Sequence, residues 1–210
     1  FALAESPAER SQLVSCALAA AALVLAGLAV FGWAPVALRI AALLAGALAV
    51  ALHLALMARA LRTGMRRELG RSFRLVKIGW GGLVASLLLA LALALELPVP
   101  RLAGWFALSL VGVWLLSFLL GMLERILPFL GAMHAAGTGR RAPTPSALTD
   151  DRALRIHFGC HVAALAGLAA GLAADSAWIT AAAALVGAAG ALAFCVFYAT
   201  LLARLQRAGA

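Results

Sequence analysis

The sequence predicts an all-α protein, a bundle of six transmembrane helices with both termini on the cytoplasmic side. Of its 210 residues, 65% are hydrophobic and only 12% are charged, whereas a soluble domain averages about 25% charged residues. The apolar residues fall into six runs, each near the roughly 20 residues that a helix needs to cross a bilayer. The basic residues gather on one side of these runs. A chain with so little charge cannot cover a water-facing surface and must face lipid.

The six apolar runs set the expected spans. Short turns separate the first run from the second, the third from the fourth and the fifth from the sixth, while longer polar connections follow the second and the fourth. None of the runs alternates with the period of an outer-membrane barrel strand. We therefore expect one integral membrane domain over residues 1–210, with spans at residues 12–31, 35–58, 78–97, 102–123, 153–174 and 177–203.

The distribution of lysine and arginine predicts the orientation. With the N-terminus inside, fifteen of the 17 basic residues fall on the cytoplasmic side, and only Arg39 and Arg101 fall on the other. Cytoplasmic connections of membrane proteins carry such an excess of basic residues. The bias also accounts for the net charge of +9, so we expect no nucleic-acid partner. The predicted location is a bacterial-type inner membrane with an anionic inner leaflet.

Residues 59–77 form the most basic stretch of the chain. Apolar residues recur every four positions, and five arginines lie between them, at Arg62, Arg66, Arg67, Arg71 and Arg74. An amphipathic helix at the anionic inner leaflet has this pattern. An ordinary basic connection between two spans also has it, and the sequence leaves both interpretations open.

Other local patterns predict helix ends and close packing. Thr149, followed by Asp150 and Asp151, is typical of an N-cap with acidic residues in the first turn. Gly167 and Gly171 form a GxxxG motif, and the last span carries further glycines and many alanines. Small residues let helix backbones approach closely in lipid, so we expect the last two spans to pack against neighbours, in this chain or in another subunit. The three cysteines all lie in apolar runs, which predicts no disulfide framework.

Four histidines are the candidates for chemistry, because polar residues within spans are costly and mark functional sites. His157 and His161 lie in the first turns of the fifth span, His53 lies toward the cytoplasmic end of the second, and His134 follows the fourth. All four therefore belong to the inner half of the bilayer. Their shared depth is the unusual observation, since four histidines in a chain of this length are not an excess.

The spacing of His157 and His161 indicates the kind of site. Residues four apart share one helix face, so the two imidazoles could hold one small ion such as copper or zinc. They cannot be opposite axial ligands of one haem, which would need His53 as a partner from another helix. Basic residues near the interface could then meet the haem propionates, namely Arg59, Arg62, Arg152 and Arg155. The structural alternative is that these histidines only bond backbone carbonyls or lipid headgroups.

Residues 121–134, GMLERILPFLGAMH, precede a proline-containing loop and a helix that carries His157. This segment resembles one in polytopic bacterial proteins related to the NnrS group and to subunit I-like proteins of the haem-copper oxidase class. The resemblance implies a respiratory setting and haem or copper ligation, with His134 and His157 as the residues that carry over. The chain departs from that pattern in having six spans rather than about twelve and in lacking the group of histidines that those proteins carry on their early helices.

Three functions are compatible with these patterns. The leading hypothesis is a membrane protein that binds b-type haem or a metal ion through His53, His157, His161 and, less centrally, His134, in respiratory electron transfer. The second is a non-catalytic accessory or assembly subunit of a larger membrane complex, with structural histidines and other membrane subunits as partners. The third is a small permease. No Ser/His/Asp arrangement, phosphate loop or carboxylate pair indicates the chemistry of a soluble enzyme.

Overall fold

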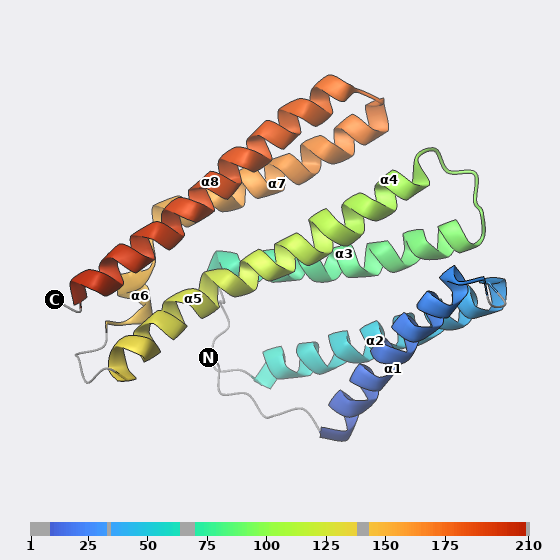
Figure 1. Cartoon of the computed structure of the whole chain (residues 1–210), viewed down its shortest axis with the longest axis horizontal. Coiled ribbons are helices and arrows are strands. Elements are labelled where there is room, and N and C mark those ends of the chain that lie inside the picture. The colour runs from blue at the N-terminus through green and yellow to red at the C-terminus, as the bar shows by residue number, and fades with distance from the viewer. Residues whose placement is uncertain (1–8, 33–34, 64–69, 138–142, 209–210) are drawn as a thin grey trace. The chain divides into compact units, whose positions relative to one another are not determined.

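The protein is all-α in the part of the chain that the structure describes (Figure 1). The computed structural model describes residues 9–32, 35–63, 70–137 and 143–208, and these ranges contain helices and turns but no strand. In chain order the helices are α1 (Glu9–Val30), α2 (Pro35–Thr63), α3 (Gly70–Ala94), α4 (Leu102–Ala107), η1 (Leu108–Leu116), α5 (Ser117–Gly137), α6 (Pro145–Leu148), α7 (Asp151–Ala174) and α8 (Ala177–Ala208).

Among the described residues, six helices are long and apolar enough to cross a membrane, as the sequence predicts. The fourth differs most from its expected span. It runs without a break over Leu102–Gly137, 36 residues, although the apolar run ends at residue 123. The helix continues because Glu124 is buried within the fold and because Pro128 is accommodated inside α5. The third helix begins at Gly70, eight residues before its apolar run.

The middle of this fourth helix is π-helical over Leu108–Leu116. A π-helix carries one more residue per hydrogen-bonded turn than an α-helix, and such segments are rare and frequent at functional sites. The segment ends directly before Ser117, whose hydroxyl lies 3.4 Å from the carbonyl oxygen of Gly112, five residues earlier. The π-helical segment therefore ends directly at Ser117, the first residue of α5.

The chain divides into two compact units, Phe1–Leu69 with Trp80–Leu110, and Gly70–Gly79 with Val111–Ala210. In the first unit α1 packs along α2 (Figure 1). Ser15 of α1 donates a hydrogen bond to the carbonyl oxygen of Ala49 at 3.3 Å. Further along the unit, Ser109 donates one to the carbonyl oxygen of Gly82 at 3.0 Å. Both serines satisfy their hydroxyls on the backbone of another helix, which is what an apolar environment requires.

In the second unit α7 and α8 lie side by side as an antiparallel pair (Figure 1). The GxxxG motif lies in their contact: a Cβ atom at Gly167 would come within 2.8 Å of the Cβ of Ala183, and one at Gly171 would collide with Thr180. From α8, a Cβ at Gly190 would lie 2.9 Å from the Cβ of Cys160. The predicted close packing of these helices is confirmed, within this chain.

Two further expectations meet the structure only in part. Residues 64–69, the centre of the basic stretch 59–77, lie outside the described residues, so the amphipathic helix there stays a prediction. The three cysteines are free thiols, as the sequence predicts; Cys16 and Cys195 are exposed and Cys160 is half-buried. On lipid-facing helix surfaces a thiol behaves as a small apolar group.

Candidate metal site

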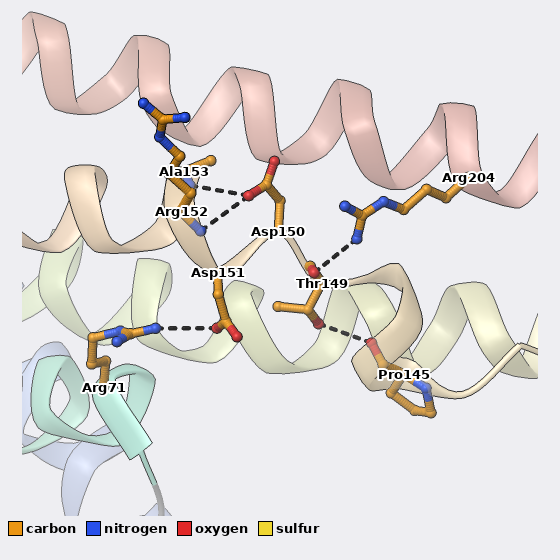
Figure 2. A network of polar contacts seen from close by, with 8 residues as sticks. All are labelled: Arg71, Pro145, Thr149, Asp150, Asp151, Arg152, Ala153 and Arg204. Carbon is orange, nitrogen blue, oxygen red and sulfur yellow. Dashed lines mark hydrogen bonds and ion pairs between the residues drawn. The ribbon is translucent and has the colours of Figure 1, made fainter.

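The candidate site lies in the second unit, on the helix α7. Figure 2 shows the polar contacts at the start of this helix, before the turns that carry the histidines. The carboxylate of Asp150 accepts hydrogen bonds from the backbone N–H groups of Arg152 and Ala153, at 3.0 and 3.2 Å. Asp150 is therefore the N-cap of α7. The predicted cap, Thr149, is wrong by one residue: Thr149 ends α6, and its hydroxyl donates to the carbonyl oxygen of Pro145.

Two arginines tie this helix start to other helices of the unit (Figure 2). Arg71 of α3 pairs with Asp151 at 3.1 Å. Arg204 of α8 donates hydrogen bonds to the carbonyl oxygens of Ala147 and Thr149, at 3.0 and 2.8 Å. These carbonyls end α6 and have no helical partner of their own. The start of α7, which leads into the turns that carry the histidines, is therefore tied to α3 and to α8.

His157 is buried between α5, α7 and α8, with 3% of its side chain exposed. Its Nδ1 lies 3.0 Å from the carbonyl oxygen of Gly190, and its ring lies 5.1 Å from that of Phe194. A carbonyl oxygen only accepts hydrogen bonds, so Nδ1 must carry the proton and donate it. In the neutral ring, Nε2 is then left with a free lone pair.

Glu124 faces this lone pair from α5. Its Oε1 lies 3.9 Å from Nε2 of His157, and 3% of its side chain is exposed. Neither atom has a hydrogen-bond partner among the described residues, and their separation exceeds the 2.7–3.2 Å of a hydrogen bond. Buried polar atoms without partners are rare in folded proteins. A nitrogen lone pair and a carboxylate oxygen that face each other away from water repel, and either a proton on one of them or a cation between them would remove that repulsion.

His161 lies one helical turn further along α7. Its Nε2 is 2.8 Å from the hydroxyl oxygen of Ser117, which is fully buried. Its ring centroid lies 5.9 Å from that of His157. The two histidines thus share one face, as their spacing predicts, and each meets a polar residue of α5. Among the described residues, no three histidine, cysteine or acidic side chains are already gathered around one point.

The remaining predicted site residues lie elsewhere. His53, half-buried in the first unit, makes an edge-to-face contact with Trp80, with ring centroids 6.3 Å apart. Because His53 and His157 belong to different units, their joint ligation of a haem stays a prediction. His134 is exposed near the end of α5. The four arginines expected at haem propionates are all exposed, two on α2 and two on α7, namely Arg59, Arg62, Arg152 and Arg155.

Glu124, Ser117 and Gly190 complete the site and were not among the predicted ligands. One signal could have indicated Glu124: an acidic residue followed by a further apolar segment, residues 126–133, within one continuous helical pattern. Such an acid inside a span is a functional candidate. No comparable signal exists for Gly190, because its contribution is a backbone carbonyl. No family model, curated protein or solved structure matches this chain.

Proposed function

We propose that this chain is a multi-pass inner-membrane protein that binds one transition-metal ion between His157 and Glu124. A single observation carries the proposal: Nε2 of His157 and Oε1 of Glu124 face each other at 3.9 Å, both buried and both without a hydrogen-bond partner among the described residues. The backbone carbonyl of Gly190 holds the ring in the tautomer that a ligand requires. Metal-bound histidines almost always donate their other N–H to a carbonyl or carboxylate in this way.

The separation suits an ion better than a direct hydrogen bond. Zinc binds imidazole nitrogen at about 2.0–2.1 Å and carboxylate oxygen at about 2.0–2.2 Å. One bond of each kind would span the 3.9 Å between Nε2 of His157 and Oε1 of Glu124 if the nitrogen–metal–oxygen angle were bent. His161, one turn away, is the third candidate ligand, and it would have to release Ser117. Imidazole and carboxylate together favour zinc, iron or copper over magnesium or calcium.

The same geometry favours an ion over the haem that the sequence also suggests. An axial histidine needs the whole porphyrin face open in front of Nε2, and Glu124 stands 3.9 Å from that atom. Haem binding by His157 would therefore require α5 and α7 to separate. The resemblance to NnrS-related proteins implies a respiratory setting, and electron transfer would need a redox-active ion. Copper or iron in the purified protein would therefore support electron transfer, whereas zinc would not.

The proposed orientation places both termini and the start of α7 in the cytoplasm. The observation that supports it is the concentration of basic residues on one side of the six long helices. Counted from Asp151 at 1.5 Å per residue, His157 lies about 9 Å along α7 and His161 about 15 Å. The site would then lie just below the inner headgroups, where an ion can enter from the cytoplasm.

Calorimetric titration of the purified, detergent-solubilised protein with Zn²⁺ tests the proposal. We expect about one ion per chain, retained through desalting. His134→Ala is the matched control, because His134 lies on the same helix as Glu124 but is exposed. The proposal is overturned if zinc binding is absent in the wild type, or if His134→Ala reduces it as much as His157→Ala. A Soret band in the purified protein would indicate haem instead.

A further inference from the structure

The core cluster of the second unit closes one end of the candidate site. Its members are Ala132, Leu148, Ala153, Leu154, Phe197 and Leu201. The cluster follows Glu124 along α5, precedes His157 along α7 and follows Gly190 along α8. All three helices therefore place it on the same side of the site, toward the end of the unit at which α5 ends and α7 begins. Phe194, whose ring contacts those of His157 and Phe197, joins the site to the cluster.

Leu148 is the member of this cluster that comes from outside the long helices. It ends α6 (Pro145–Leu148), a four-residue helix whose first three residues are exposed, whereas Leu148 itself is 1% exposed. Its side chain reaches α5, because a Cβ atom at Gly131 would lie 3.4 Å from Cδ1 of Leu148. Protein interiors hold few voids larger than a water molecule, so a hydrated ion cannot pass this end of the unit while Leu148 is in place. We name Pro145–Leu148 the α6 plug.

Few contacts hold the α6 plug in position. Arg204 of α8 donates hydrogen bonds to the carbonyl oxygens of Ala147 and Thr149, at 3.0 and 2.8 Å, and Figure 2 shows the second of these. An isolated helix of four residues is not stable in water, so the position of the plug depends on Arg204 and on the burial of Leu148. Segments with few buried contacts open locally at a smaller free-energy cost than the rest of a protein.

We propose that the α6 plug is a gate, which moves away to admit an ion to His157 and Glu124 and returns to bury it. Leu148 is the residue that blocks entry, and Arg204 is the residue that holds the gate closed. The inference deepens the proposed function and rests on it for the identity of the ion. Because neither residue is a proposed ligand, changing them should alter the rates at which the ion enters and leaves much more than the affinity.

Acylation of the zinc-free full chain by diethyl pyrocarbonate tests the gate without using a metal. The reagent reacts with an unprotonated imidazole nitrogen, and hydrogen bonding to Gly190 leaves Nε2 of His157 in that form. Site-resolved mass spectrometry should show His157 reacting at least about tenfold more slowly than the exposed His134. Leu148→Ala should raise the rate at His157 about tenfold, since losing most of a buried leucine side chain shifts an opening equilibrium by about that factor. Arg204→Gln should raise it several-fold, because the plug loses its hydrogen bonds to α8.

Matched variants separate the gate from other effects. Leu202→Ala truncates a leucine of α8 that is 41% exposed, and Arg207→Gln removes an exposed arginine one turn beyond Arg204; both should react like the wild type. Leu148→Met, which nearly keeps the volume of the side chain, should do so as well. Gly171→Ala strains the opposite end of α7 and reports general loosening of the unit. An equal rise in Gly171→Ala, or no rise in Leu148→Ala and Arg204→Gln, overturns the inference.

Zinc kinetics then connect the gate to the metal ion. Release of bound Zn²⁺ to a chromophoric chelator should be about tenfold faster from Leu148→Ala than from the wild type, with nearly the same affinity. Release at an unchanged rate overturns the gate and leaves the metal site standing. If the protein binds no zinc, the metal proposal fails, and the acylation rates still decide whether α6 controls access to His157. Acylation of wild-type His157 as fast as that of His134 would overturn the gate whatever the zinc result.

Discussion

His157→Ala should lower the affinity of the protein for zinc by at least about a hundredfold. Loss of a residue that only supports a metal ligand typically costs 10–100-fold in affinity, and His157 is proposed as a ligand itself. The substitution removes the nitrogen that lies 3.9 Å from Glu124, so the ion would keep the carboxylate of Glu124 and could gain only His161 as a further ligand. Competition titration against a chromophoric chelator measures the change. Glu124→Gln, which keeps the size of the side chain but removes its charge, should weaken binding less.

The matched variants separate ligation from folding. A lone buried carboxylate is destabilising, whereas replacing both members of a buried polar pair by apolar residues is often neutral or stabilising. Glu124→Leu/His157→Leu should therefore remain folded and bind no zinc. Tight zinc binding by this double variant would show that the ion lies elsewhere in the protein. Ser117→Ala is informative as well, because it frees His161 and should preserve or tighten binding.

Gly171→Ala should destabilise the second unit by about 1–3 kcal/mol, the usual cost of overpacking a tight contact. A Cβ atom at this position would collide with the side chain of Thr180 and lie 2.9 Å from its backbone nitrogen. A backbone atom of a helix cannot move aside as the end of a flexible side chain can. The two helices would therefore have to separate near the turn that joins them. Equilibrium unfolding in mixed detergent micelles, followed by circular dichroism, measures the loss.

Gly159→Ala is the matched control for this substitution. Gly159 lies on the same helix, and a Cβ atom there would meet nothing within 4 Å. Since alanine is favoured over glycine in a helix by up to about 1 kcal/mol, this variant should be neutral or more stable. Equal behaviour of the two variants would show that α7 and α8 are not closely packed at Gly171. Destabilisation by Gly159→Ala alone would point to a contact of α7 with another molecule.

The fold followed from the sequence because the bilayer constrains it so strongly. A run of about 20 apolar residues with a polar break on each side leaves few alternatives to a spanning helix. The ends of the helices were harder to predict from the sequence. Thr149 and Asp150 are both good caps, and which one starts α7 depends on α6, a four-residue helix that hydropathy does not reveal. The fourth apolar run was predicted to end at residue 123 because hydropathy treats Glu124 and Arg125 as an interruption, whereas the helix passes through them with Glu124 buried.

The candidate site was predictable in part. The shared face of His157 and His161 follows from helical spacing alone. Which residue of another helix meets them depends on the rotation and height of α5 relative to α7, and helical periodicity within one chain segment does not contain that information. The tautomer of His157 depends on the carbonyl of Gly190 in α8, so it could not be inferred before the two helices were placed together.

X-ray absorption spectroscopy at the zinc edge of the loaded protein shows which atoms surround the ion. We expect a first shell of nitrogen and oxygen at about 2.0–2.2 Å, with the outer-shell scattering of imidazole, and we expect this signal to be lost in Glu124→Leu/His157→Leu. A shell at about 2.3 Å would indicate thiolate ligands, which means that the ion is bound by cysteines and not by His157 and Glu124. A first shell of oxygen without imidazole, or a spectrum unchanged in the double variant, would contradict the site.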